Sequence, residues 1–127
     1  MKKTILIMTI GIFLFGNIGL FAQKISKMPQ ASVGGKTSGS ISKTELLTTG
    51  KLSLNLTTKK IYSFVLVVNN VEYPNPSGYL FNDAVKAAIN GIRKNTEITF
   101  SKITVSQVND PNAPLEVIKD LKLTVKP

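Results

Sequence analysis

The chain has 127 residues, a formal net charge of +9 and no cysteine, histidine or tryptophan, so it is long enough for one ordinary domain. This composition excludes disulfides, thiol nucleophiles, imidazole acid–base catalysis and metal sites built from cysteine or histidine. Ser, Thr, Lys, Tyr and seven carboxylates remain for chemistry, and the positive charge indicates a surface that attracts anions.

The first 22 residues have the pattern of a secretory signal peptide. Met1-Lys2-Lys3 is a short positive region, Ile5–Phe15 is an apolar run, and Ala22 is the small residue expected before a cleavage site. Leu20, at the third position before the cut, is larger than usual, and Thr4–Gln23 is uncharged for 20 residues. A retained membrane anchor is therefore the alternative, but an asparagine and three glycines in this stretch favour cleavage. We expect a periplasmic, outer-membrane-associated or extracellular protein that does not span the membrane after cleavage.

Residues 23–40 are polar and rich in Gly, Ser and Lys, which predicts a flexible leader or an extended edge segment. Gly34-Gly35-Lys36-Thr37 resembles the end of a phosphate-binding loop. A Walker loop also needs a glycine five residues before its Gly-Lys-Thr and a buried strand leading into it. Gln30 occupies that position, so no nucleotide site is predicted. Three glycines are interpreted instead as backbone positions that other residues seldom adopt: Gly34, Gly35 and Gly39.

A short helical turn is predicted over Ile41–Leu47, because Ser42 can cap it and Glu45 stands three residues further on, the capping-box spacing. Ser42 and Lys43 could also form a Ser/Lys hydrolase pair. Such a pair needs a desolvated lysine and preorganised oxyanion donors, which neighbours on a polar segment do not provide. Ser42 is therefore interpreted as a cap and Lys43 as a surface lysine.

Two strands and a turn are predicted next. Lys51–Leu56 has leucine at every second position, the pattern of a half-buried strand. Ile61–Val68 is almost continuously apolar and β-branched, which predicts a central strand covered on both faces, with Phe64 in the core. Tyr73–Gly78 is rich in Pro, Asn and Gly and is interpreted as a turn.

One helix is predicted over residues 83–94. Asn82 is a suitable N-cap and Asp83 complements the helix N-terminus. Apolar residues at helical spacing define its buried face: Val85, Ala88, Ile89 and Ile92. The helix is expected to end near Lys94-Asn95, where the cation suits the dipole.

The C-terminal part predicts further strands. Ile98 and Phe100 are one residue out of phase with Ile103 and Val105, so a β-bulge is expected at Ser101-Lys102. A turn over residues 109–114 precedes a strand at residues 121–125. The fold predicted is mainly β (α+β): a small sandwich-like domain over residues 41–127 with one helix.

Neither the acidic nor the basic residues form a recognisable site in the sequence. The carboxylates lack the spacing of a catalytic pair or a calcium loop. The lysines are scattered and lack the interleaved aromatic residues of a nucleic-acid groove. We therefore predict no cofactor, no metal, no nucleotide and no nucleic-acid partner.

Three stretches stand out in the exported part: PQASVGGKTSGSISKTELL, YSFVLVV and NGIRKNTEITFSKITV. Together with a closing short strand, they resemble the C-terminal domain of the gliding-motility protein GldM, also called PorM, over nearly the whole exported part. That domain typically opens with proline, alanine, valine and two glycines, followed by another glycine and an Ile-Ser-Lys-x-x-Leu turn. A strand with a Ser-Phe step and a late helix-to-strand unit come next. The matching positions are Pro29, Ala31, Val33, Gly34, Gly35, Gly39, Ile41, Ser42, Lys43, Leu46, Leu47, Ser63, Phe64, Ile92, Phe100 and Ile103.

The resemblance implies a mostly β periplasmic domain of the type IX secretion and gliding machinery. In that machinery, the full-length family protein is an inner-membrane-anchored dimer that reaches toward an outer-membrane ring. The family's domain has no catalytic residues to carry over. Here the domain follows the signal peptide directly, without the membrane helix, helical segment or preceding β domains, and residues 57–60 are a shortened segment. We therefore expect a stand-alone relative.

The expected function is contact rather than catalysis. The leading hypothesis is a non-enzymatic module that binds envelope proteins, including secretion or gliding components, through an exposed sheet edge or the Gly-rich leader. The alternative is a basic module that binds anionic envelope glycans, with affinity that falls steeply with salt. A hydrolase is a third hypothesis, and it requires Ser42 or Lys43 to be catalytic.

Overall fold

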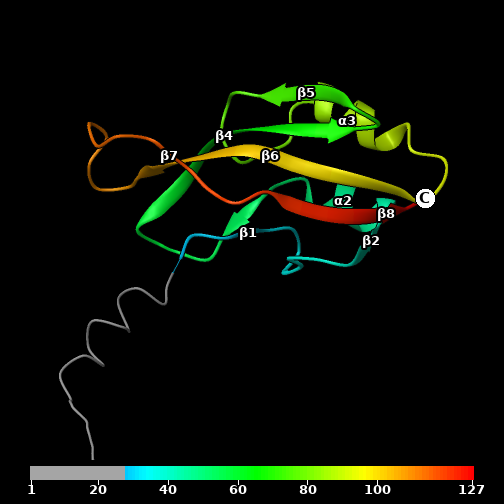
Figure 1. Ribbon diagram of the computed structural model, residues 1–127, viewed down its shortest axis with the longest axis horizontal. Coiled ribbons are helices and arrows are strands. Elements are labelled where there is room, and N and C mark those ends of the chain that lie inside the picture. The colour runs from blue at the N-terminus through cyan, green and yellow to red at the C-terminus, as the bar shows by residue number, and fades with distance from the viewer. Residues whose placement is uncertain (1–27) are drawn as a thin grey trace, which may run out of the picture.

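The computed structural model describes residues 28–127, in which two helices and a two-stranded sheet cover one face of a larger mixed sheet (Figure 1). The predicted signal peptide, residues 1–22, lies outside the described residues. In chain order the elements are β1 (Ala31–Ser32), β2 (Ser40–Ser42), α2 (Lys43–Thr49), β3 (Ser53–Leu54), β4 (Lys59–Val68), β5 (Val71–Asn75), α3 (Asp83–Asn90), β6 (Thr96–Gln107), β7 (Glu116–Val117) and β8 (Leu121–Lys126).

The larger sheet has the strand order β2-β8-β6-β4-β5, and the short β7 also pairs with β6. Strand β2 runs parallel to β8, and the other pairs are antiparallel. The smaller sheet pairs β1 with β3. The predicted mainly β, α+β class is confirmed. Helices α2 and α3 make up much of the layer opposite the larger sheet, so this layer is not a second large sheet.

The larger sheet is fully buried on one face only. Along β4 and β6, inward side chains such as Leu66 and Ile98 have no exposed surface. Strand β4 lies between β6 and β5, as predicted for a central strand. Its outward side chains are not fully covered, because Tyr62 is 51% exposed and Val65 and Val67 are partly exposed. The expectation of cover on both faces is therefore wrong.

Three phenylalanine rings join the layers. Phe64 of β4 meets Phe100 of β6 edge-to-face, with centroids 5.6 Å apart, and Phe81 just before α3 lies 5.9 Å from Phe64 and 5.7 Å from Phe100. All three are buried. Each buried ring contributes roughly 1.5–3 kcal/mol relative to an exposed one. Phe64 therefore belongs to the core, and Phe81 fixes the start of α3 against the sheet.

The bulge predicted at Ser101-Lys102 is confirmed. The pairing of β4 with β6 shifts between Ser63 and Val65, and Lys102 takes a φ of 49°. A second shift lies between Ile61 and Ser63. Each strand thus contains one extra residue, which returns its apolar side chains to the buried face on both sides of the irregularity.

Strand β5 (Val71–Asn75) takes up the first half of the turn predicted over Tyr73–Gly78. Asn69 and Asn70 have φ of 52° and 66° and form a two-residue hairpin between β4 and β5, the geometry that favours asparagine and glycine. β5 is an edge strand, where Pro74 can be accommodated because one side has no ladder to maintain. The carbonyl of Pro74 accepts a hydrogen bond from Asn82 Nδ2 at 3.0 Å.

The strand predicted over Lys51–Leu56 is shorter than its leucine alternation indicates. Ser53 and Leu54 form the ladder with the equally short β1, and Lys51 makes an isolated bridge with Leu80. Leu52 is nevertheless buried. The apolar pattern therefore identifies the inward side chain but not the length of the ladder.

The predicted domain start at residue 41 is too late. Ala31 and Val33, within the segment 23–40 expected to be a flexible leader or an extended edge segment, are 2% and 0% exposed and belong to the core cluster. The described part of that segment also provides β1 and pairs β2 with β8. Ala31 and Val33 are enough to attach this segment to the domain, because the large sheet supplies the rest of the core into which they pack.

Both helices differ from their predicted bounds. α2 runs over Lys43–Thr49, because Ile41 is used in the ladder with β8. α3 has the predicted N-cap, in which Asn82 Oδ1 accepts from the Val85 N–H at 2.9 Å, but it ends at Asn90 rather than near residue 94. None of the helices within residues 28–127 is long and apolar enough to cross a membrane.

A fully buried asparagine fixes the loop between β5 and α3. Asn75 Nδ2 donates to the carbonyls of Gly78 and Leu80 at 3.0 and 3.1 Å, and its Oδ1 accepts from the Asn82 N–H at 2.7 Å. One side chain thus satisfies three backbone groups, which makes the loop conformation dependent on it.

Replacing Asn75 with alanine leaves those backbone groups without their partner. We expect Asn75→Ala to lower the free energy of unfolding by about 3 kcal/mol, measured by urea denaturation. The exposed Asn95 provides the control, and Asn95→Ala should change stability by less than about 0.5 kcal/mol. Equal effects for the two variants would contradict the assignment.

Candidate functional site

The glycine-lysine element is the tip of a tight β-turn. The Val33 N–H donates to the Lys36 carbonyl at 3.1 Å, and the Lys36 N–H donates back to the Val33 carbonyl at 2.9 Å. Gly34 and Gly35 between them have φ of 56° and 82°, which glycine adopts at no steric cost. After this turn the chain enters strand β2 rather than a helix, so its local geometry differs from that of a Walker loop.

Ser42 and Lys43 each cap the end of a helix. Ser42 Oγ accepts from the Glu45 N–H at 3.0 Å and caps the start of α2. The half-buried Lys43 extends to the other helix, where its Nζ donates to the carbonyls of Asn90 and Ile92 at 3.2 and 3.0 Å. Arg93 Nη1 donates to the same Asn90 carbonyl at 2.7 Å. Lys43 is therefore a tertiary cap of α3, not simply the surface lysine predicted.

The other two residues of the predicted structural motif lie elsewhere. Phe64 is in the core, and Gly39 has a φ of 86° with its carbonyl accepting from the Thr124 N–H at 2.8 Å. Among residues 28–127, no group of three or more acidic side chains lies close enough to hold a metal ion. The motif residues therefore surround α2 and the core without converging on one reactive centre.

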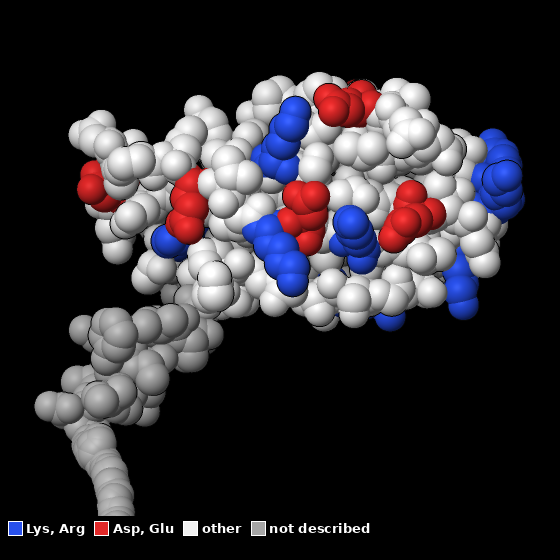
Figure 2. Space-filling model, in the orientation of Figure 1, with Lys and Arg blue, Asp and Glu red and all other residues white. Residues whose placement is uncertain are grey.

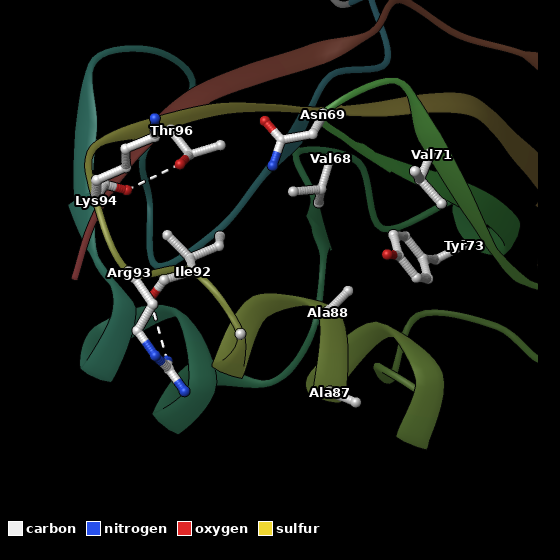
Figure 3. Close-up of a pocket in the computed structure, with 11 residues that line it drawn as sticks. Val68, Asn69, Val71, Tyr73, Ala87, Ala88, Ile92, Arg93, Lys94 and Thr96 are labelled. Atoms are coloured by element: carbon white, nitrogen blue, oxygen red, sulfur yellow. Dashed lines mark hydrogen bonds between the residues drawn. The ribbon is translucent and has the colours of Figure 1, made fainter.

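A hollow lies between the β4–β5 hairpin and the C-terminal end of α3 (Figure 3). Its volume is about 500 Å³. Val68 and Ile92, both buried, lie at its floor together with Ala88 of α3. Val71 and Tyr73 of β5 form the wall at one end. We call this hollow the α3 cleft.

Polar groups surround the α3 cleft. Lys94 and Thr96 stand at the end opposite Tyr73, and the Thr96 hydroxyl donates to the Lys94 carbonyl at 2.8 Å. Asn69 projects from the hairpin above the floor, while Arg93 points away toward the end of α3. The lining residues include lysine and arginine but no carboxylate.

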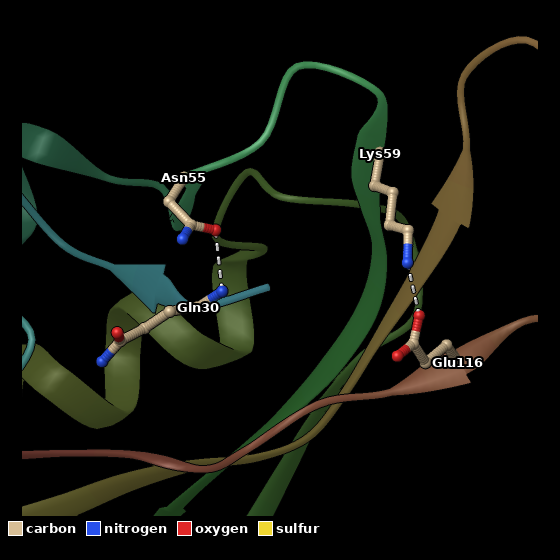
Figure 4. Close-up of polar contacts among 4 residues, drawn as sticks. All are labelled: Gln30, Asn55, Lys59 and Glu116. Atoms are coloured by element: carbon tan, nitrogen blue, oxygen red, sulfur yellow. Dashed lines mark hydrogen bonds and ion pairs between the residues drawn. The ribbon is translucent and has the colours of Figure 1, made fainter. Parts of the chain in front are cut away.

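A second hollow, of about 320 Å³, lies between residues 28–30 and residues 116–119. Its walls are fixed by side chains seen in Figure 4. Asn55 Oδ1 accepts from the Gln30 N–H at 2.8 Å, and Lys59 forms an ion pair with Glu116 at 2.7 Å. These contacts tie the start of the described chain and β7 to the body of the fold.

Local sequence patterns do not reveal the α3 cleft. They predict a turn at Tyr73 and a helix end near Lys94, and nothing in them connects the two residues. The adjacent residues Asn69 and Asn70 were the available signal, because asparagine tolerates positive φ and a two-residue hairpin would have set Val71 and Tyr73 beside β4. The early end of α3 also had a signal, because Gly91 directly follows Asn90 and caps the helix.

No protein-family model matches the chain, and no curated protein matches it. The resemblance to GldM C-terminal domains therefore stays a prediction from the sequence. The geometry of the described residues is independent of that resemblance.

The backbone at Gly34 requires glycine. Alanine there would keep a φ of 56° and place its Cβ 3.4 Å from Glu45 Oε2, so Gly34→Ala should cost about 1–2 kcal/mol of stability. Gly91 has a φ of −78° and ordinary Cβ space, so Gly91→Ala should be neutral or stabilising by up to about 1 kcal/mol. Thermal unfolding of both variants measures the two stability changes. Equal changes for Gly34→Ala and Gly91→Ala would show that the backbone at Gly34 is not constrained.

Removing the ammonium of Lys43 tests its capping role. Lys43→Met keeps most of the aliphatic stem but loses both donations to α3, and we expect a loss of about 1–2 kcal/mol. Lys86→Met, on the exposed face of α3, should change stability by less than about 0.5 kcal/mol. Amide hydrogen exchange should also accelerate at residues 87–92 in Lys43→Met only. Unchanged protection there would contradict the cap.

Proposed function

We propose that this protein is a non-enzymatic, protein-binding module of the cell envelope. The observation that carries the proposal is the contrast between two sets of residues. Ser42 and Lys43 cap helices, whereas the α3 cleft is open, with an aliphatic floor and polar residues around it. An open apolar surface with polar groups around it is typical of a contact site.

The cleft adds a route of contact to the two routes expected from the sequence. At the β5 edge, Pro74 has no N–H, and its carbonyl is already bonded to Asn82, so Pro74 itself cannot pair with an added strand. In the Gly-rich segment, Ala31 and Val33 are buried in the core, whereas Gly34, Gly35 and Gly39 are exposed. Docking of side chains into a groove needs neither of these regions.

The envelope location and a link to type IX secretion or gliding are supported by sequence features. These features are the signal-like residues 1–22 and the match from Pro29 to Leu47 with GldM C-terminal domains. The alternative partner, an anionic glycan, is less well supported. The face in Figure 2 has acidic side chains interspersed with the basic ones rather than one continuous positive surface.

Affinity capture from the organism's envelope tests the proposed function. The full chain with a C-terminal tag should crosslink reproducibly to a defined envelope protein in living cells, identified by mass spectrometry. Tagged Phe81→Ala, which removes a core ring, is the unfolded-protein control and should lose that partner. Capture of anionic polymer alone, abolished by moderate salt, would replace the proposal with glycan binding. Recovery of nothing above the untagged background would reject it.

A further inference from the structure

The floor of the α3 cleft can accept one bulky apolar side chain. Val68 and Ile92 are 6% and 4% exposed, and Ala88 between them has a short side chain that leaves room above the helix. Val71 at the wall is 50% exposed. An incoming leucine or phenylalanine would remove mainly its own apolar surface and that of Val71 from water, the main favourable term in such contacts.

The polar groups around the cleft are potential donors to a ligand. Figure 3 shows the Tyr73 hydroxyl turned into the cleft and Lys94 at the opposite end. Within residues 28–127, neither the Tyr73 hydroxyl nor the Lys94 ammonium takes part in a hydrogen bond. Lys94 also forms no ion pair with a described residue, since the salt bridge found in this range joins Lys59 to Glu116. The lining of the cleft itself has no carboxylate, although Lys94 also lines an adjoining hollow together with Glu97. A phenol and an ammonium without hydrogen-bond partners favour a ligand that brings acceptors and negative charge.

The openness of the cleft indicates how large its ligand is. A small-molecule pocket typically encloses most of its ligand, whereas Val71, Asn69 and Lys94 leave this cleft open to solvent on one side. A ligand bound here therefore stays partly exposed and needs contacts beyond the cleft to bind well. A segment of a folded partner provides such contacts.

We propose that the α3 cleft docks a partner-protein segment that places an aliphatic or aromatic side chain over Val68 and Ile92 and a carboxylate beside Lys94. This rests on the proposed function and names the chemistry of the segment that the partner presents. The carboxylate lies at the Lys94 end, and the Tyr73 hydroxyl donates to a backbone carbonyl of the segment at the other end.

Peptide titration followed by nuclear magnetic resonance tests the inference without knowledge of the partner. The probe is an acetylated, amidated peptide of leucine and phenylalanine followed by two glutamates, added to the isotope-labelled exported chain. We expect amide shifts confined to residues 68–73 and 87–96. A peptide with lysines in place of the glutamates, and one with glycines in place of the apolar pair, should each bind at least about fivefold more weakly.

Two pairs of variants give matched controls. Lys94→Glu should weaken the probe about fivefold or more, whereas Lys86→Glu, the same charge change on the outer face of α3, should not. Ala88→Arg fills the cleft and should abolish binding, whereas Ala84→Arg, exposed in the first turn of the same helix, should leave it intact. Because Lys94 is exposed, its variant stays folded and remains informative if Ala88→Arg does not fold.

Several results would overturn the inference. One is amide shifts that map outside residues 68–73 and 87–96, and another is an equal loss of peptide affinity in Lys94→Glu and Lys86→Glu. A third is undiminished binding of the peptide with glycines in place of the apolar pair, which would indicate general polyanion binding. If an envelope protein is captured equally by wild type and Lys94→Glu, the cleft inference fails and the proposed function stands. If the probe binds in the cleft but no envelope protein is captured, the proposed function fails and the cleft chemistry stands.

Discussion

The structure depends on covering one face of a sheet whose other face is left partly open to water. Strands β4, β6 and β8 present a continuous row of inward aliphatic and aromatic side chains, and Phe64 and Phe100 lie at its centre. No disulfide or metal ligand from cysteine or histidine is available in this sequence, so burial has to supply the stability. The two helices, Phe81 and even Val33 beside the glycine turn are placed so that they close over this face.

Local chemistry predicted those elements whose information is local. Asn82 as an N-cap, the bulge at Ser101-Lys102 and the final strand all follow from side-chain type and phase over a few residues. The misplaced elements depend on partners far away in the chain. Pro74 signals a turn unless its strand is known to lie at an edge, and the two-residue length of β3 is set by β1. Periodicity therefore gave the inward side chains, but distant pairing determined where each element stopped.

The same distinction holds for the candidate site. Gly34 and Ser42 could be assigned from their own chemistry, because a positive φ and a helix cap are properties of one or two residues. The α3 cleft could not be assigned in this way. It exists only where the β4–β5 hairpin approaches the end of α3, and its polar residues, Tyr73 and Lys94, are brought together by that approach alone. The role of Lys43, whose acceptors lie on another helix, is equally invisible to local patterns.

The point at which α3 ends links stability to the shape of the cleft. Lys43 and Arg93 donate to the Asn90 carbonyl, which compensates the unpaired carbonyls and the negative end of the helix dipole. The chain can then leave the helix at Asn90 and set Ile92 against Val68 on the floor, with Lys94 on the rim. In a helix continued to residue 94, Ile92 and Lys94 would be fixed by helical geometry instead. The cap that stabilises the helix end therefore also positions the apolar floor and the cation. A change in the cap should therefore alter the shape of the cleft.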